Sequence, residues 1–364
     1  MKIALCPIDT WFFRDSTPFT QGESPQAGVA SVFPPHPPSV VGAIRAAVAR
    51  SLGWDGRSPW RARETAVLGD GAELGPLSFT GPFVLRDDEA VFPLPRHVMV
   101  ARAGAEWAAV GRLVPGPLVD SDLGAMRLPV PESPGSAAVK PSRTRPWVTR
   151  AGLQRILVGE LPRPGELLDE SSLWTTESRV GIARAPASRA VEPGMLYSTR
   201  HVRPRANVSV AVELSGLAAD WQPSGIVPFG GEHRLAALQP WPGLRLDHLD
   251  AGDAVRGGRL TLVALTPLRL PPTAIAGRVP VMPGLRIASA CVDRPLRVGG
   301  WSSVARGPVP LTNAVAPGAT LFCQVDGAAA RDLVFDRGLL RLGRDVAAGF
   351  GLCAVLRDPW KEIS

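Results

Sequence analysis

The sequence predicts an α+β fold whose first elements open as a ferredoxin-like unit does. Apolar residues alternate in several short stretches, which is typical of strands, and one stretch has clear helical spacing. Pro and Gly number 38 each among 364 residues, so we expect long ordered loops between short strands. A strand, a long loop and a helix of small residues begin the chain, and that order opens a βαββαβ unit.

The first strand is predicted at residues 2 to 9 and the first helix at residues 40 to 52. Apolar residues recur along this helix at helical spacing, Ser39 fits as its N-cap and Gly53 as its end. Small side chains at Gly42 and Ala43 would let the helix lie close to a sheet.

Residues 54 to 150 are predicted to be a loop-rich insertion, because prolines interrupt them repeatedly. Within and after this insertion we expect two short strands at 79 to 94 and a short helix at 153 to 157. The clearest strand is 207 to 214, which alternates as a half-buried strand does. Further strands are expected at 260 to 265, 320 to 325 and 350 to 356, with a short helix at 333 to 342.

The chain is long enough for two domains, and we predict them at residues 1–215 and 216–364. The net charge is +7, and the basic residues are almost all Arg, since Lys occurs only at positions 2, 140 and 361. Arg binds phosphate through two parallel hydrogen bonds and stacks on bases, so the composition indicates a nucleic-acid partner. A GC-rich genome that favours Arg codons is the alternative source of the Arg bias.

The four cysteines are scattered and show no Cys-x-x-Cys pair, so buried free thiols are expected. The first 13 residues do not read as a signal peptide, and no apolar run is long enough to span a membrane. We therefore expect a soluble cytoplasmic protein with no membrane partner.

Four stretches combine glycine or arginine with aromatic residues. Gly349, Phe350 and Gly351 precede the last strand, where glycine could turn backbone N–H groups toward phosphate; a tight turn into the strand is the alternative. Gly299 and Gly300 precede Trp301, on which a base could stack; a Trp packed inward is the alternative. A third stretch carries Arg143 and Arg145 around Trp147. The fourth carries Arg179, Arg200 and Arg203 between aromatic residues, which suits a nucleic-acid groove; a solvated basic loop is the alternative.

Motifs for catalysis are largely missing from the sequence. It contains no metal-ligand spacing, no Gly-x-Ser-x-Gly and no phosphate-binding Walker loop, so no metal or cofactor is expected. His36 is a candidate general base before the first helix, although a turn residue is the simpler interpretation. Tyr197 is the single tyrosine and so the one candidate for a Tyr acid.

Short motifs in a fixed order resemble one family. They are residues 8–15 with Pro18-Phe19, residues 33–45, residues 177–182, residues 194–197, residues 230–234, residues 299–301 and residues 349–351. This set is similar to the third subunit of the type III-B CRISPR effector, the Cmr complex, within the RAMP superfamily. Ser16 and Ser302 depart from the pattern of that family.

The resemblance implies a pair of modified ferredoxin-like (RRM-type) domains with long loop insertions. It implies a subunit without catalytic activity that binds the repeat-derived 5′ handle of CRISPR RNA. Its expected protein partners are the large polymerase-like subunit and an adjacent RAMP backbone subunit. The glycine loop at 349–351 would face the RNA, as would Arg14, Ser39, Gly42 and Arg45.

Two other functions stay open at this point. Related RAMP proteins cleave CRISPR repeat RNA without metal, and His36 could serve such an endoribonuclease. The third possibility is a scaffold that works through protein contacts and touches RNA little.

Overall fold

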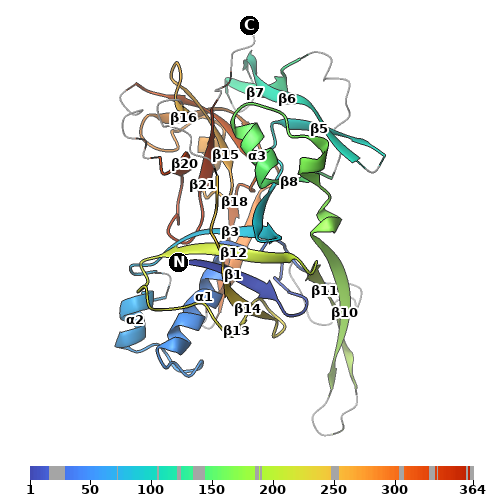
Figure 1. Ribbon diagram of the computed structural model, residues 1–364, viewed down its shortest axis with the longest axis vertical. Coiled ribbons are helices and arrows are strands. Elements are labelled where there is room, and N and C mark those ends of the chain that lie inside the picture. Colours follow the sequence, from blue (N-terminus) through green and yellow to red (C-terminus); the bar gives the residue numbers. More distant parts are fainter. Residues whose placement is uncertain are drawn as a thin grey trace.

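The computed structural model describes residues 1–15, 29–71, 73–104, 106–120, 124–133, 144–184, 188, 191–246, 254–302, 307–327, 333, 335–357 and 360. Its α-helices are α1 (Pro37–Ser51), α2 (Ala62–Leu68), α3 (Arg150–Leu157) and α5 (Pro272–Ile275), and short 3-10 turns lie at η2 (Pro164–Glu166) and η3 (Glu170–Ser172). Figure 1 shows a lower lobe with α1 and α2, an upper lobe that holds the C-terminal strands together with α3 and the strands between residues 98 and 131, and a long hairpin that projects from the lower lobe. The mixture of helices with antiparallel sheets confirms the α+β class.

An eight-stranded sheet forms the lower lobe. Its strands, in spatial order, are β13 (Ile226–Pro228), β14 (Leu235–Pro240), β1 (Lys2–Pro7), β12 (Val208–Ser215), β3 (Ser78–Arg86), β4 (Glu89–Pro93), β8 (Trp147–Thr149) and β9 (Leu167–Leu168). Along β1, Ile3 and Leu5 point to the face covered by α1, whereas Ala4 belongs to the core shared with the upper lobe. The sheet is thus a middle layer with apolar packing on both faces.

Burial on both faces corrects the expectation of a half-buried strand at 207 to 214. In β12, Val210 and Val212 pack toward α1, while Ala211 is fully buried on the other face. The strand itself is confirmed within one residue.

Helix α1 begins earlier than the sequence predicts. Its first residue is Pro37, which suits the first turn because proline needs no donor there. The N-cap is therefore His36, and Ser39 lies inside the first turn, so the predicted Ser39 cap is wrong.

The upper lobe contains a five-stranded sheet. Its spatial order is β16 (Leu285–Cys291), β19 (Thr320–Val325), β15 (Arg259–Ala264), β21 (Leu352–Leu356) and β20 (Leu339–Arg341). The strands predicted at 260 to 265, 320 to 325 and 350 to 356 are all confirmed. The helix predicted at 333 to 342 is wrong, because the described part of this stretch forms a turn and β20.

Three smaller sheets complete the described fold. They are β5 (Val98–Ala103) with β6 (Glu106–Val119) and β7 (Met126–Pro131); β10 (Trp174–Arg184) with β11 (Val191–Pro204) and β2 (Val29–Ala30); and β17 (Leu296–Ser302) with β18 (Gly307–Ala314). The interval from 54 to 150 is therefore not loop-rich: it holds α2 and the strands β3 to β8. The two strands predicted at 79 to 94 and the helix predicted at 153 to 157 are confirmed as β3, β4 and α3.

The first sheet continues to Pro240, beyond the boundary predicted near residue 215, and the division into two domains stays a prediction. Cys291, Cys323 and Cys353 are buried free thiols, as expected, while Cys6 is half-buried. No helix in the described part of the chain is long and apolar enough to cross a membrane.

Candidate nucleic-acid interface

Strands β10 and β11 form a hairpin, here called the first arm, that extends well beyond the lower lobe (Figure 1). Its base is packed into the lobe, since Trp174 and Val202 are buried and Val202 exchanges two 2.8 Å backbone hydrogen bonds with Trp11. Farther out, Val180 is 69% exposed. The arm therefore has a fixed base and a distal part open to a partner.

The three predicted arginines of the first arm have different surroundings. Arg179 and Arg203 each form an ion pair with Asp9, at 2.8 and 3.0 Å. Arg200 is exposed and forms no ion pair with any residue that the structure describes. Because Arg200 pairs with Ser178 in the ladder, it lies on the arm face opposite to Arg179.

Strands β17 and β18 form a second hairpin, here called the second arm. Val298 anchors it in a small core with Ala314 and Phe350. Trp301 is 66% exposed near the end of β17, so the inward packing considered as an alternative is wrong. Gly300 has open space where a Cβ would stand, whereas a Cβ on Gly299 would lie 2.6 Å from the Leu311 side chain. The second arm thus presents an exposed Trp ring beside an open glycine.

The glycine loop before β21 is packed inside the protein, contrary to the expectation that it faces RNA. The amide of Gly349 donates to Val346 O at 3.1 Å, and that of Gly351 donates to Pro267 O at 2.8 Å. Phe350 is 1% exposed, under the guanidinium of Arg269 at 4.3 Å from the ring centre. Both glycines have positive φ, so the tight-turn interpretation holds for this loop.

The start of α1 also differs from the expected RNA contact. Arg45 is 8% exposed and donates hydrogen bonds to the carbonyl oxygens of Gly69, Gly71 and Glu73. Its guanidinium stacks over Trp60 at 4.8 Å. The pKa of Arg45 is lowered, mainly because the guanidinium is buried. Arg45 therefore stabilises the loop after α2. Gly42 is exposed with open space around it and does not face the sheet.

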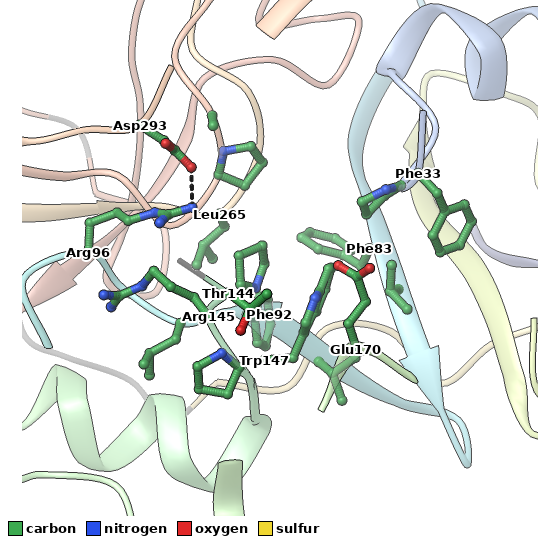
Figure 2. Close-up of a pocket in the computed structure, with 18 of the residues that line it drawn as sticks. Phe33, Phe83, Phe92, Arg96, Thr144, Arg145, Trp147, Glu170, Leu265 and Asp293 are labelled. Atoms are coloured by element: carbon green, nitrogen blue, oxygen red, sulfur yellow. Dashed lines mark hydrogen bonds and ion pairs between the residues drawn. The ribbon is translucent and has the colours of Figure 1, made fainter. Parts of the chain in front are cut away.

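A cavity of about 680 Å³ lies between the lobes, and aromatic and proline side chains form much of its wall. Figure 2 shows Arg96 paired with Asp293 and, close to them, Arg145, while Glu170 and Phe33 line the opposite side. Arg145 donates to the carbonyl oxygens of Pro95, at 3.2 Å, and Val98, at 2.6 Å. We call this cavity the interlobe cleft.

Three groups of the interlobe cleft have shifted pKa values. Burial, with a smaller contribution from Arg269, lowers the pKa of His36, whose buried Nε2 has no hydrogen-bond partner among the described residues. Burial raises the pKa of Glu170, which also lines the cleft. Burial and the neighbouring Arg96 lower the pKa of Arg145 to about 10. Because the shift is downward from 6.5, the imidazole of His36 is neutral at pH 7.

A comparison with known protein families identifies the family of this chain. The sequence matches the family described as CRISPR-associated protein (Cas_Cmr3) over residues 3–358. The chain belongs to this family. The family that the ordered sequence motifs resemble is thereby confirmed.

Two solved structures share the fold of this Cmr3-family chain. One is a chain of the type III-B Cmr-β complex bound to cognate target RNA and AMPPnP, with 16% identity and a TM-score of 0.51. The other is from the same complex bound to cognate target RNA, with 17% identity and a TM-score of 0.51. Each match covers 88% of this chain and 86% of the other chain. No protein of curated function matches the sequence.

Three observations complete the description of the predicted site residues and of possible metal ligands. Among the residues that the structure describes, no group of three or more His, Cys, Asp or Glu side chains could hold a metal ion. Arg14 is exposed beside the first arm, at an isolated bridge with Ser31. Arg143 lies outside the described residues.

Sequence reasoning missed Asp9 and Glu177 as partners of the arm arginines, and Arg96, Asp293 and Glu170 in the cleft. Asp9 and Glu177 both lie in motifs that point to the family, and Glu177 stands two residues before Arg179, which was the available local signal. The cleft residues come from segments far apart in the chain, so no local pattern could have united them.

Proposed function

We propose that this chain is a subunit without catalytic activity that binds the repeat-derived 5′ handle of CRISPR RNA in a type III-B effector. The observation that carries the proposal is Trp301, which is 66% exposed on the second arm. A soluble protein rarely leaves so large an aromatic ring uncovered, and single-stranded RNA binds to such rings by stacking. Arg200 and Arg14 supply exposed cations for the phosphates.

The strand orders support a pair of modified ferredoxin-like domains. Such a fold has the spatial order 4-1-3-2, counted along its four strands. In the lower lobe, β14, β1, β12 and β3 follow this order, with α1 in the first connection. In the upper lobe, β21, β15, β19 and β16 follow it too, with α5 in the first connection. The two arms are then insertions between the second and third strands of each unit.

We further propose that the chain joins the large polymerase-like subunit to a backbone subunit. Apolar side chains are exposed on the β6–β7 hairpin, where Leu118 is 61% and Leu128 is 53% exposed. This hairpin lies at the top of Figure 1, and the first arm extends from the opposite end. Two exposed apolar hairpins at opposite ends suit a protein that contacts two neighbours. The similar chains described above come from Cmr-β complexes bound to target RNA, which is consistent with this role.

Substitution of Trp301 tests the RNA proposal. The full chain carrying Trp301→Ala should bind a repeat-derived RNA about 5- to 100-fold more weakly, as expected for the loss of one stacked base. Leu118→Ala is the matched control, because it removes a similarly exposed apolar side chain from a different hairpin. Equal affinity of the Trp301→Ala variant and the native chain would refute stacking on this ring.

An endoribonuclease is the second candidate, and the position of His36 favours it. Its imidazole lines the same cleft as Glu170 and stays neutral at pH 7, as a general base must. Incubation of the pure protein with repeat RNA in EDTA decides between the two functions. Specific cleavage that His36→Ala abolishes would establish the nuclease and overturn the proposal of a subunit without activity.

A scaffold with little RNA contact is the third candidate, and the exposed apolar hairpins are its support. RNA that co-purifies with the assembled effector separates this case from the first. An unchanged amount of bound guide RNA after both Trp301→Ala and Arg200→Ala would favour the scaffold.

A further inference from the structure

Asp9, just after β1, is the meeting point of three arginines from three segments. Its carboxylate accepts from Arg179 of β10 at 2.8 Å, from Arg203 of β11 at 3.0 Å and from Arg234 at 3.1 Å. Arg234 comes from the turn between β13 and β14. One carboxylate thus joins both strands of the first arm to the edge of the eight-stranded sheet.

Glu177 closes these contacts into a ring. Its two carboxylate oxygens accept from Arg179 at 2.9 Å and from Arg203. Each of the two arginines is therefore held by both carboxylates, which fixes the guanidinium planes. The side chains of Arg179 and Arg203 remain 32% and 45% exposed, so part of each guanidinium faces solvent.

Buried contacts next to this ring of ion pairs fix the same face of the arm. The ring of His201 stacks on Phe12 at 5.0 Å, and its nitrogens contact the hydroxyls of Thr10 at 3.2 Å and Thr199 at 3.0 Å. His201 and Thr199 lie on the Glu177 face of the hairpin, according to the strand register. The base of the arm is thus held by a neutral buried layer and by the charged ring above it.

The charges make Asp9 necessary for this arrangement. Three guanidinium groups converge on two carboxylates, so removal of one carboxylate leaves three like charges beside a single counter-charge. Arg234 has no other carboxylate among its hydrogen-bond partners in the described structure, since its remaining bond goes to Glu232 O at 2.9 Å. Without Asp9 the turn and the arm would repel each other.

We propose that Asp9 is the positioning residue of the first arm. It fixes the direction of the hairpin and presents the outward N–H groups of Arg179 and Arg203 to the phosphates of a single RNA strand. The presentation of these N–H groups to RNA rests on the proposed RNA-binding function. The coupling of the arm to the sheet stands independently.

Two physical effects of removing the Asp9 charge have opposite signs, which makes the test sharp. If Asp9 were only one negative charge on a basic surface, its neutralisation would strengthen RNA binding, because phosphate affinity rises with net positive charge. If Asp9 positions the arm, its neutralisation weakens binding although the net charge becomes more positive.

The experiment compares the full chain with Asp9→Asn, Asp9→Glu and Asp345→Asn variants. Asp345 is the matched control, because it is a similarly exposed carboxylate paired with one arginine, Arg269, and its variant has the same added charge. In Asp9→Asn we expect amide hydrogen exchange in β10 and β11 to become about tenfold faster, and RNA affinity to fall about threefold or more. Asp9→Glu should restore part of both properties, and Asp345→Asn should leave the arm amides unchanged.

Tighter or unchanged RNA binding by Asp9→Asn, with arm exchange as in the native chain, would overturn the inference. If the native chain binds no handle RNA, the proposed function fails, and the exchange rates still decide whether Asp9 holds the arm. If Asp9→Asn does not fold, the Arg234→Met variant serves instead. It keeps the ion pairs of Asp9 and Glu177 with Arg179 and Arg203 but removes the contact of Arg234 with Asp9, so the arm amides should exchange faster than in the native chain. Unchanged exchange in Arg234→Met would count against the coupling.

Discussion

Tyr197, the one tyrosine of the chain, lies directly over Gly181 across the ladder of the first arm. A Cβ built on Gly181 would stand 2.3 Å from Cζ and 2.5 Å from the hydroxyl oxygen of Tyr197. An aromatic ring that covers a cross-strand glycine shields the backbone where glycine gives a strand no side chain to pack. In this part of the arm, the contact between Tyr197 and Gly181 provides the packing that a hydrophobic core provides elsewhere. Tyr197 therefore has a structural role.

Substitution Gly181→Ala should displace the Tyr197 ring and loosen the arm. We expect a loss of about 1 to 3 kcal/mol in the free energy of unfolding, as for other overpacked sites, if the arm unfolds with the rest of the chain. Hydrogen exchange of the β10 and β11 amides and urea unfolding would measure the effect. Gly42→Ala is the control, since its open helical position should gain about 0.5 to 1 kcal/mol. Equal stability of the two variants would contradict the packing role of Tyr197.

Replacement of Arg45 by Met should reduce stability rather than RNA affinity of the folded protein. Three carbonyl oxygens, those of Gly69, Gly71 and Glu73, lose a charged donor, at a cost of about 3 kcal/mol. Urea unfolding monitored by tryptophan fluorescence would show the change. Arg50→Met, on an exposed position of the same helix, serves as the control and should cost less than about 1 kcal/mol. A stable Arg45→Met protein that no longer binds RNA would return Arg45 to the interface.

Substitution of Gly351 separates a packing turn from a phosphate cradle. A Cβ there would lie 2.0 Å from Leu342 O, and φ is +80°, so Gly351→Ala should cost about 2 kcal/mol or more. Gly300→Ala is the control, because nothing lies near its Cβ position. Thermal unfolding of both variants would measure the difference. A loss of RNA binding in Gly351→Ala without any loss of stability would favour the cradle instead.

Stability should fall as the pH drops below about 6.5 because of buried histidine. The pKa of His97 is lowered from 6.5 to about 3, mainly by burial and further by the nearby charges of Arg112 and Arg145. Between these values the unfolded chain binds a proton that the folded chain does not, so the contribution is complete above pH 6.5 and declines as the pH falls. The slope is about 1.4 kcal/mol per pH unit for one such group.

The control for this pH dependence is His97→Gln, which does not titrate and can still bond Thr320, the partner of His97 Nδ1 at 2.9 Å. Melting temperatures from pH 7.5 to 5 should fall less steeply in this variant. His36 and His201 also have lowered pKa values, so part of the slope should remain. Identical slopes in both proteins would show that His97 is not the group responsible.

Local periodicity predicted most of the strands, and the failures have physical causes. The β6–β7 hairpin was read as loop because Pro115, Pro117 and Pro129 interrupt its pattern. The structure accommodates these prolines in a small sheet with a register shift between Pro115 and Leu118, where ladder donors are not needed. The helix expected at 333 to 342 fails because Leu339 and Leu340 pair with β21 instead.

The sequence by itself determined the family, the α+β class and the basic character, because these depend on local patterns and on the order of short motifs. Only the tertiary structure decided which motif residues are available to a partner. Arg45, Phe350 and Gly351 turned inward to satisfy buried carbonyl groups and close packing, while Trp301 remained exposed. Whether an arginine is exposed to solvent or paired with a carboxylate depends on segments far away in the chain, as the pair of Asp9 and Arg203 demonstrates. A local sequence pattern cannot predict such a contact.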